Sequence, residues 1–136
     1  MNNELDTKSK RIYEIVNNWL EVVEGGDPTQ IANLYAEQGV LLGTVAENVK
    51  QGRSVIKTYF DMFVQKNPQG TLNSIIFKSL GDKHGIADGN YTFMLDDKEG
   101  RNPVRARFTF VINLESELIE THHSSSTPAK PSPTDF

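Results

Sequence analysis

Cysteine is missing from the 136-residue sequence. Without thiols, the chain can form neither a disulfide framework nor a zinc site with thiolate ligands. Long apolar runs are missing as well, since no stretch reaches the roughly 18 residues that a membrane-spanning helix needs. Residues 1–11 are polar and charged and lack the apolar segment of a signal peptide. We therefore expect a cytoplasmic protein that has no membrane partner.

Excess positive charge is also absent. The sequence has 18 Asp and Glu residues against 14 Lys and Arg residues, which gives a formal net charge of −4, and no block of basic residues stands out. Because a basic patch or stripe marks a nucleic-acid-binding surface, we expect no nucleic-acid partner. Hydrophobic residues make up 37% of the chain, enough for the modest core of one domain.

Helical periodicity is confined to the first half of the chain. Residues 8–24 carry apolar side chains at spacings of three and four and end at Gly25-Gly26. Asp27 is a good N-cap and Pro28 suits the first helical position, so a second short helix is predicted there, ending at Gly39. Its apolar stripe consists of Ile31, Leu34 and Tyr35.

A third helix is predicted over residues 53–66, after a short apolar strand at 40–42. The rest of the chain is rich in β-branched and aromatic residues, which favour strands. The four predicted strands are residues 71–80, 84–96, 103–114 and 117–126. Within residues 106–112, Phe108 and Phe110 face one way, and Arg107, Thr109 and Val111 face the other.

Helices followed by an antiparallel meander predict an α+β fold. We expect a cone-shaped, curved antiparallel sheet packed on three N-terminal helices, with a pocket at the open end. Residues 1–127 would form the single domain. Residues 128–136, rich in Pro and Ser, would be a flexible tail.

Three segments together resemble a known family. Residues 19–27 (Trp-Leu-Glu-Val-Val-Glu-Gly-Gly-Asp), followed by Leu-Tyr-Ala at 34–36, resemble the opening of nuclear transport factor 2-like domains. Residues 52–60 have a glycine, six intervening residues and Tyr-Phe, as the association domain of calcium/calmodulin-dependent protein kinase II does. The strand with Arg107 and the final strand, 119–125, are similar to the last two strands of that domain and of its bacterial stand-alone relatives, which end in His-His-Ser-Ser.

The resemblance covers roughly residues 10–127 and implies a nuclear transport factor 2-like, cystatin-like or SnoaL-like fold. It also implies self-association as a homodimer or a higher homo-oligomer. No kinase domain is present, so kinase activity is not implied.

Arg107 is the first candidate site residue. It lies between Ala106 and Phe108 in an apolar strand, and an inward-pointing arginine would need an acid or an anionic ligand as its partner. The resemblance matches Arg107 and Tyr59 to residues of a deep pocket, where a guanidinium and a hydroxyl would bind a carboxylate. Alternatively, Arg107 pairs with a structural acid or points to solvent, and Tyr59 is an aromatic residue on the core face of its helix.

Two further positions bear on the ligand. Arg105 shares a strand face with Arg107 and would lie in the pocket or at its rim. Asn90 falls where the association domain has another pocket arginine, a departure that suggests a different ligand.

The histidines point to a cavity group rather than to a metal. His122 and His123 are adjacent in a predicted strand and therefore project to opposite faces, and only His84 remains as a further ligand. We expect no metal site, and one histidine, His122 by the resemblance, would reach the cavity. Trp19 is either core or part of the pocket wall.

An enzyme of this fold would need cavity acids. The ketosteroid isomerases use an Asp base together with an oxyanion hole made by a Tyr and a protonated Asp. Laid on that pattern, the chain has Trp19 in place of the Tyr and Gly43 in place of the base, and the strand 101–112 contains no acid. For a SnoaL-like cyclase, Asp88 or Glu120 would be the candidate acid, and the alternation does not say which way either faces.

Two functions remain open from the sequence. One is a homo-oligomerising, association-domain-like protein whose cavity binds a small, anionic ligand or a peptide carboxylate. The alternative is a small-molecule enzyme, an isomerase, cyclase or hydratase. No Gly-x-Gly-x-x-Gly pattern follows a strand, and we expect no cofactor.

Overall fold

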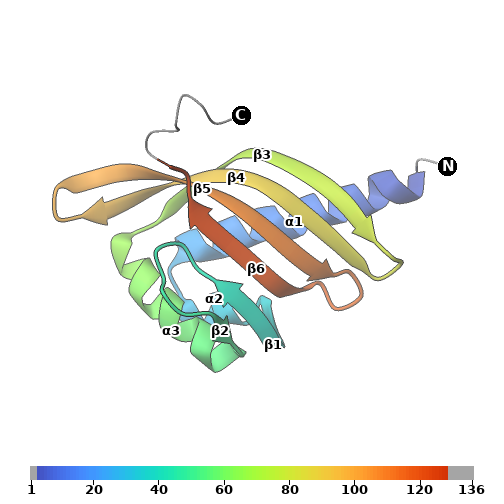
Figure 1. Ribbon diagram of the computed structural model, residues 1–136, viewed down its shortest axis with the longest axis horizontal. Coiled ribbons are helices and arrows are strands. Elements are labelled where there is room, and N and C mark those ends of the chain that lie inside the picture. Colours follow the sequence, from blue (N-terminus) through green and yellow to red (C-terminus); the bar gives the residue numbers. More distant parts are fainter. Residues whose placement is uncertain (1–2, 129–136) are drawn as a thin grey trace.

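A computed structural model describes residues 3–128 of the chain, and the side chains of residues 7–128. The predicted tail lies outside these residues except for Pro128. The first helix, α1, spans Asn3–Gly25 and lies along the concave side of the sheet (Figure 1). Its buried side chains recur at spacings of three and four, as the sequence predicts. They are Ile12, Val16, Trp19, Leu20 and Val23.

The second helix, α2, spans Pro28–Ala32 and begins as predicted. The carboxylate of Asp27 accepts hydrogen bonds from the backbone N–H groups of Thr29, at 2.9 Å, and Gln30, at 3.4 Å. This satisfies two of the N–H groups that every helix leaves without a partner at its start.

The predicted extent of α2 is wrong, because Tyr35 begins a strand. Strand β1 spans Tyr35–Leu42 and contains Gly39, which was expected to end the helix. Tyr35 lies opposite Ile119 of the last strand, and the backbone N–H of Ile119 donates to the carbonyl of Leu34 at 2.9 Å. The pairing partner lies far along the chain, so the local apolar pattern could not reveal it.

The third helix, α3, spans Arg53–Phe63 and continues as a 3-10 turn over Val64–Lys66, which confirms the helix predicted over 53–66. A short strand, β2, covers Lys50–Gln51 just before it. Helices α2 and α3 lie beside β1 and β2 at one end of the sheet (Figure 1).

The sheet has six strands in the order β2-β1-β6-β5-β4-β3. The four long strands confirm the predicted meander: β3 Gln69–Leu80, β4 His84–Asp97, β5 Gly100–Asn113 and β6 Leu118–Ser126. The sheet was expected to be antiparallel throughout, but β1 and β6 run parallel. Parallel neighbours need a long connection, and here α3 and three long strands lie between them in the chain.

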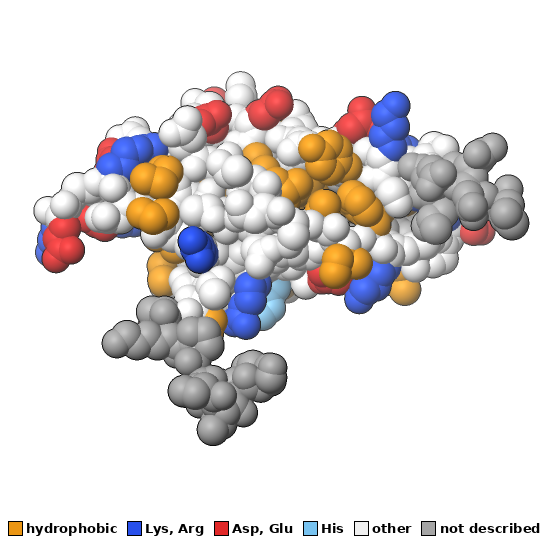
Figure 2. Space-filling model, turned by 90° about the horizontal axis from the view of Figure 1, so that it is seen from above, with side chains coloured by type: hydrophobic (Ala, Val, Ile, Leu, Met, Phe, Trp, Pro, Cys, Tyr) orange, Lys and Arg blue, Asp and Glu red, His pale blue; other side chains and the backbone are white. Residues whose placement is uncertain are grey.

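The two faces of the sheet differ in character. On β5, Ala106, Phe108, Phe110 and Ile112 are buried against the helices and alternate with less buried residues, which confirms the predicted alternation. Within the described part of the chain, no helix covers the opposite, outer face (Figure 1). Seen from above the view of Figure 1, the surface of the molecule has hydrophobic side chains near its middle and charged side chains nearer its edges (Figure 2).

Within residues 3–128, no helix combines the length and the apolar character that a membrane span requires.

One glycine allows a close approach of the backbones of β3 and β4. Gly89 lies opposite Ile75, next to an irregularity in β3 between Leu72 and Ser74. A Cβ atom on Gly89 would lie 2.0 Å from the carbonyl oxygen of Ser74, a backbone atom that cannot rotate away.

We expect Gly89→Ala to lower the free energy of unfolding by about 1–3 kcal/mol, the usual cost of overpacking. Urea unfolding followed by circular dichroism measures this. The control is Gly25→Ala, because a Cβ there meets nothing within 4 Å. Equal stabilities of the two variants would contradict the role assigned to Gly89.

Candidate functional site

A cavity of about 420 Å³ lies between the helices and the concave face of the sheet, a size typical of small-molecule sites. Its walls are mainly aromatic. They include Trp19, Tyr59, Phe60, Phe63, Tyr91 and Phe93. Charged side chains of both signs lie among the more exposed lining residues, at the mouth: Lys50, Lys66, Asp96 and Asp97.

His122 lies at the inner end of this cavity and is only 1% exposed. Its ring stacks on Phe110 with the centroids 3.9 Å apart, and the edge of Trp19 meets it at 5.0 Å. A polar ring in such surroundings must have hydrogen-bond partners on both nitrogens to avoid a large desolvation cost.

Both ring nitrogens of His122 have tyrosine partners. Nδ1 lies 2.8 Å from the hydroxyl oxygen of Tyr35, and Nε2 lies 3.1 Å from that of Tyr91. The indole Nε1–H of Trp19 donates to the Tyr35 oxygen at 3.0 Å. The Tyr35 hydroxyl is thereby free to donate to Nδ1, which leaves the histidine proton on Nε2.

The same hydrogen bonds continue toward the cavity wall. The Tyr91 hydroxyl donates to Oγ of Ser124 at 2.7 Å, and that oxygen lies 2.6 Å from Oγ1 of Thr44. We call this series the buried polar chain. Its members, in order, are Trp19, Tyr35, His122, Tyr91, Ser124 and Thr44. Among the described residues, no buried side-chain nitrogen or oxygen is left without a partner.

Burial keeps the groups around the cavity neutral. Loss of solvent, helped by the nearby His123, lowers the pKa of His122 to about 3. Burial likewise raises the pKa of Tyr35 and of Tyr91. It raises the pKa of Tyr59 to about 12, although the Thr44 carbonyl, which accepts from the Tyr59 hydroxyl at 3.2 Å, acts in the opposite direction. At neutral pH the tyrosines keep their protons and His122 does not take up a second one, so none of them carries a charge.

Three of the residues selected from the sequence line the cavity: Tyr59, Trp19 and His122. His122 is buried and His123 is exposed, so the expectation that they project to opposite faces is confirmed. Trp19 belongs both to the core and to the cavity wall.

The expected inward position of Arg107 is wrong. Arg107, Arg105 and Asn90 are exposed, and none of them lines the cavity. Arg107 alternates with the buried Phe108 and lies opposite Asn90 in the neighbouring strand. Since the aromatic side chains of β5 face the helices, the arginines must face outward.

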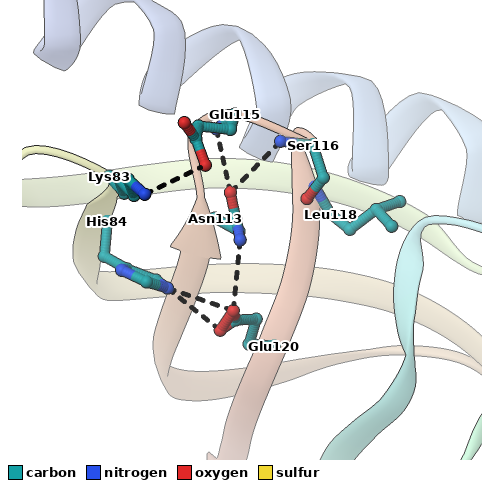
Figure 3. A network of polar contacts seen from close by, with 7 residues as sticks. All are labelled: Lys83, His84, Asn113, Glu115, Ser116, Leu118 and Glu120. Carbon is teal, nitrogen blue, oxygen red and sulfur yellow. Dashed lines mark hydrogen bonds and ion pairs between the residues drawn. The ribbon is translucent and has the colours of Figure 1, made fainter.

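The acids proposed for a cyclase also lie outside the cavity. Asp88 accepts from the hydroxyl of Thr109 and pairs with Lys78 at 3.2 Å. Glu120 contacts Nε2 of His84 through both carboxylate oxygens, at 3.0 and 3.1 Å, near the β5–β6 turn (Figure 3). Asn113 donates to the same carboxylate at 3.4 Å.

Gly43, predicted from the sequence to stand at the position of the isomerase base, has no room for a side chain. A Cβ atom there would lie 2.5 Å from Cε2 of Tyr59, so the tyrosine ring fills the space that a side chain would need. The described residues also contain no group of three His, Asp or Glu residues that could hold a metal ion.

Four members of the buried polar chain were missed in the sequence. Tyr35 was assigned to a helix, and Ser124 was not selected as a site residue. Tyr91 could have been found, because it alternates with Phe93 in a predicted strand and thus shares the buried face. Thr44 follows a strand and carries no pattern of its own.

Known proteins share both sequence and fold with this chain. The profile of the calcium/calmodulin-dependent protein kinase II association domain matches residues 8–128. A crystal structure from Xanthomonas campestris, described as such an association domain, is 38% identical, with 88% of this chain and 87% of that chain covered and a TM-score of 0.82. No curated protein matches the sequence significantly.

More distant structures share the fold alone. The epoxide hydrolase/cyclase-like enzyme SalBIII, described as acting in pyran ring formation in salinomycin, is 19% identical over 93% of this chain and 95% of its own, with a TM-score of 0.72. A nuclear transport factor 2-like protein with a cystatin-like fold from Novosphingobium aromaticivorans is 12% identical, covering 93% and 86% of the two chains, with a TM-score of 0.76. The expected fold class is therefore confirmed.

The neutral state of His122 makes stability depend on pH. Below the ordinary histidine pKa of about 6.5, the unfolded chain takes up a proton at His122 that the folded chain refuses, down to its own pKa of about 3. Folding stability is therefore lost as the pH falls through this window, by up to about 1.4 kcal/mol per pH unit from this group.

We expect the loss of stability that His122 causes at low pH to be absent in His122→Gln, because the glutamine amide can donate and accept hydrogen bonds but does not titrate. Urea unfolding between pH 7.5 and 4.5 tests it: the stability curve of the wild type should fall more steeply than that of the variant. His84→Gln, at a partly exposed histidine, is the control and should keep the steep fall. Parallel curves for wild type and His122→Gln would contradict a neutral, buried His122.

Proposed function

The chain belongs to the calcium/calmodulin-dependent protein kinase II association domain family, and from this premise we propose that it self-associates and binds a small molecule in its aromatic cavity. The observation that carries the proposal is the cavity itself, with its aromatic walls and the neutral polar chain at its inner end. Apolar walls with a few placed polar groups are typical of ligand sites.

Self-association is supported by the uncovered outer face of the sheet. A sheet buries one face on its own helices and commonly covers the other with another layer. On the edge strand β3, Ile76 is 63% exposed and Leu80 is 53% exposed. The family membership and these apolar side chains together favour a homo-oligomer built through this face.

The expected anionic character of the ligand loses its basis with the outward position of Arg107. Inside the mouth, the lining residues are apolar, aromatic or neutral and hydrogen-bonded. A buried charge without a partner would be costly there. We therefore propose a ligand with an apolar body.

The enzyme alternative, suggested by the fold shared with SalBIII, lacks a carboxylate or imidazole without hydrogen-bond partners among the described residues that line the cavity, and the lining lysines, Lys50 and Lys66, lie at the mouth. The acids among them are Asp96 and Asp97, at the mouth. Asp96 accepts from Asn67 at 2.7 Å and pairs with Arg101 at 2.9 Å, and these partners lower its pKa. His122 is neutral and has both nitrogens occupied. A general acid or base would need a free, titrating group, so binding is the better supported function.

The interface can be tested with a charge on the outer face. We expect the wild type to form at least a dimer at micromolar concentration, and Ile76→Asp to shift it toward the monomer, because a carboxylate cannot be buried in an apolar contact. Light scattering after size-exclusion chromatography measures the mass. The control is Val55→Asp on α3, at an apolar residue that is 42% exposed. A monomeric wild type would refute self-association.

The cavity can be tested with N-phenyl-1-naphthylamine, a neutral probe that fluoresces in apolar sites. Ala106→Leu places a larger side chain at a buried lining position and should weaken probe binding by about tenfold or more, measured by fluorescence titration. Arg107→Ala is the matched control, because Arg107 follows Ala106 in the strand but faces outward. This variant should bind the probe as tightly as the wild type does. Failure of the wild type to bind the probe, or equal binding by Ala106→Leu, would argue against the cavity as a ligand site.

A further inference from the structure

The buried polar chain holds one more proton than it has hydrogen bonds. Each member contributes one N–H or O–H group, and each hydrogen bond joins two neighbours in the series. Hydrogen bonds in a row use one proton per link, so one donor remains unused at an end of the chain.

The unused donor lies at the Thr44 end because the direction of the hydrogen bond is fixed at the Trp19 end. The indole N–H of Trp19 can only donate, so Tyr35 must accept from it. If His122 carried its proton on Nδ1 instead, Tyr35 would accept two hydrogen bonds and its own proton would have no acceptor among the described residues. The series therefore runs from Trp19 toward Thr44.

The last link leaves the free proton at the Ser124–Thr44 pair. Oγ of Ser124 already accepts from Tyr91, so its own hydroxyl can donate to Oγ1 of Thr44. The Tyr59 hydroxyl engages the backbone carbonyl of Thr44 and leaves the Thr44 hydroxyl unengaged. Both Thr44 and Ser124 line the cavity, and Thr44 is the more exposed. Hydrogen bonds in a row polarise one another, which strengthens the terminal donor.

From this arrangement we propose that the cavity selects neutral ligands that carry a carbonyl oxygen, such as ketones, aldehydes or esters, and that this oxygen accepts a hydrogen bond from the Thr44 hydroxyl. The inference rests on the proposed function, binding of a small molecule in this cavity. The Thr44 hydroxyl is a donor on the wall of an apolar cavity, and a ligand that covers it without offering an acceptor would lose affinity.

The charge of the ligand follows from the surroundings. A carboxylate would also accept from Thr44, but the lining groups beyond the mouth are uncharged at neutral pH. The charged lining residues at the mouth, Lys50, Lys66, Asp96 and Asp97, have balancing signs. An anion would therefore lose its hydration without gaining a net opposite charge, whereas a carbonyl loses little.

Three naphthalene compounds of nearly equal shape test the proposal. They are 2-acetylnaphthalene, with a ketone oxygen; 2-isopropenylnaphthalene, with a methylene group in place of that oxygen; and 2-naphthoate, with a carboxylate. Each competes with N-phenyl-1-naphthylamine for the wild-type protein. The ketone should bind about five- to tenfold more tightly than the alkene, the factor expected for one neutral hydrogen bond. The carboxylate should bind more weakly than the ketone.

Thr44→Val removes the hydroxyl with little change of shape and should abolish the ketone preference while leaving the affinity for the alkene unchanged. The control is Thr58→Val, because Thr58 also lines the cavity but donates its hydroxyl to the carbonyl of Val55 in its own helix. Tyr91→Phe interrupts the chain upstream and should reduce the preference in part, and its unfolding midpoint is measured alongside.

The proposal is overturned if ketone and alkene bind the wild type equally, if Thr44→Val keeps the preference, or if the carboxylate binds most tightly. These outcomes differ from failure of the proposed function, in which the fluorescent probe and all three compounds fail to bind.

Discussion

The rest of this structure depends on the hydrogen bonds that the neutral, buried imidazole of His122 makes with two tyrosines. The imidazole connects β6 to β1 through Tyr35 and to β4 through Tyr91, while Trp19 brings in α1 from the opposite layer. Each partner is itself buried and needs a hydrogen bond, and leaving any one of them unpaired would cost about 1–3 kcal/mol. The network therefore fixes how the helix and three strands meet at the base of the cavity.

This network also keeps the groups at the inner end of the cavity neutral. Hydrogen bonds on both nitrogens of His122 and burial behind aromatic rings keep it from accepting a proton at neutral pH. Gly43, covered by the ring of Tyr59, leaves no room for a carboxylate. These groups are the basis of the proposed binding function, since function follows from the groups in the cavity and not from the fold.

The charged candidate residues that do not line the cavity lie on the outer face of the sheet. Arg105 and Arg107 lie there with the exposed Ile76, and Glu120 and Asp88 hold their own partners nearby. A mixture of apolar and paired charged groups suits a surface that another copy of the chain covers. The two faces thus divide the proposed functions, with the ligand on the concave side and association on the convex side.

The wrong prediction for Arg107 shows what a local sequence pattern can and cannot establish. The alternation in residues 106–112 already separated Phe108 and Phe110 from the arginine, and a one-sided sheet must turn its aromatic face toward the helices, so the outward position was available from the sequence. For His122 and His123 the alternation gave no such answer. The resemblance indicated His122, and the position of His122 opposite the buried Phe110 across β5 and β6 gives the physical reason.

By itself, the sequence determined the α+β class, the first and third helices, the N-cap at Asp27 and the four long strands, because capping and periodicity act between residues close in the chain. It also determined the family, since the motifs keep their order over nearly the whole length. Only the tertiary structure decided that Tyr35 belongs to a strand and that Trp19, Tyr35, His122, Tyr91, Ser124 and Thr44 form one series. These contacts join residues that lie far apart in the chain, and burial gives them their strength, which no local pattern encodes.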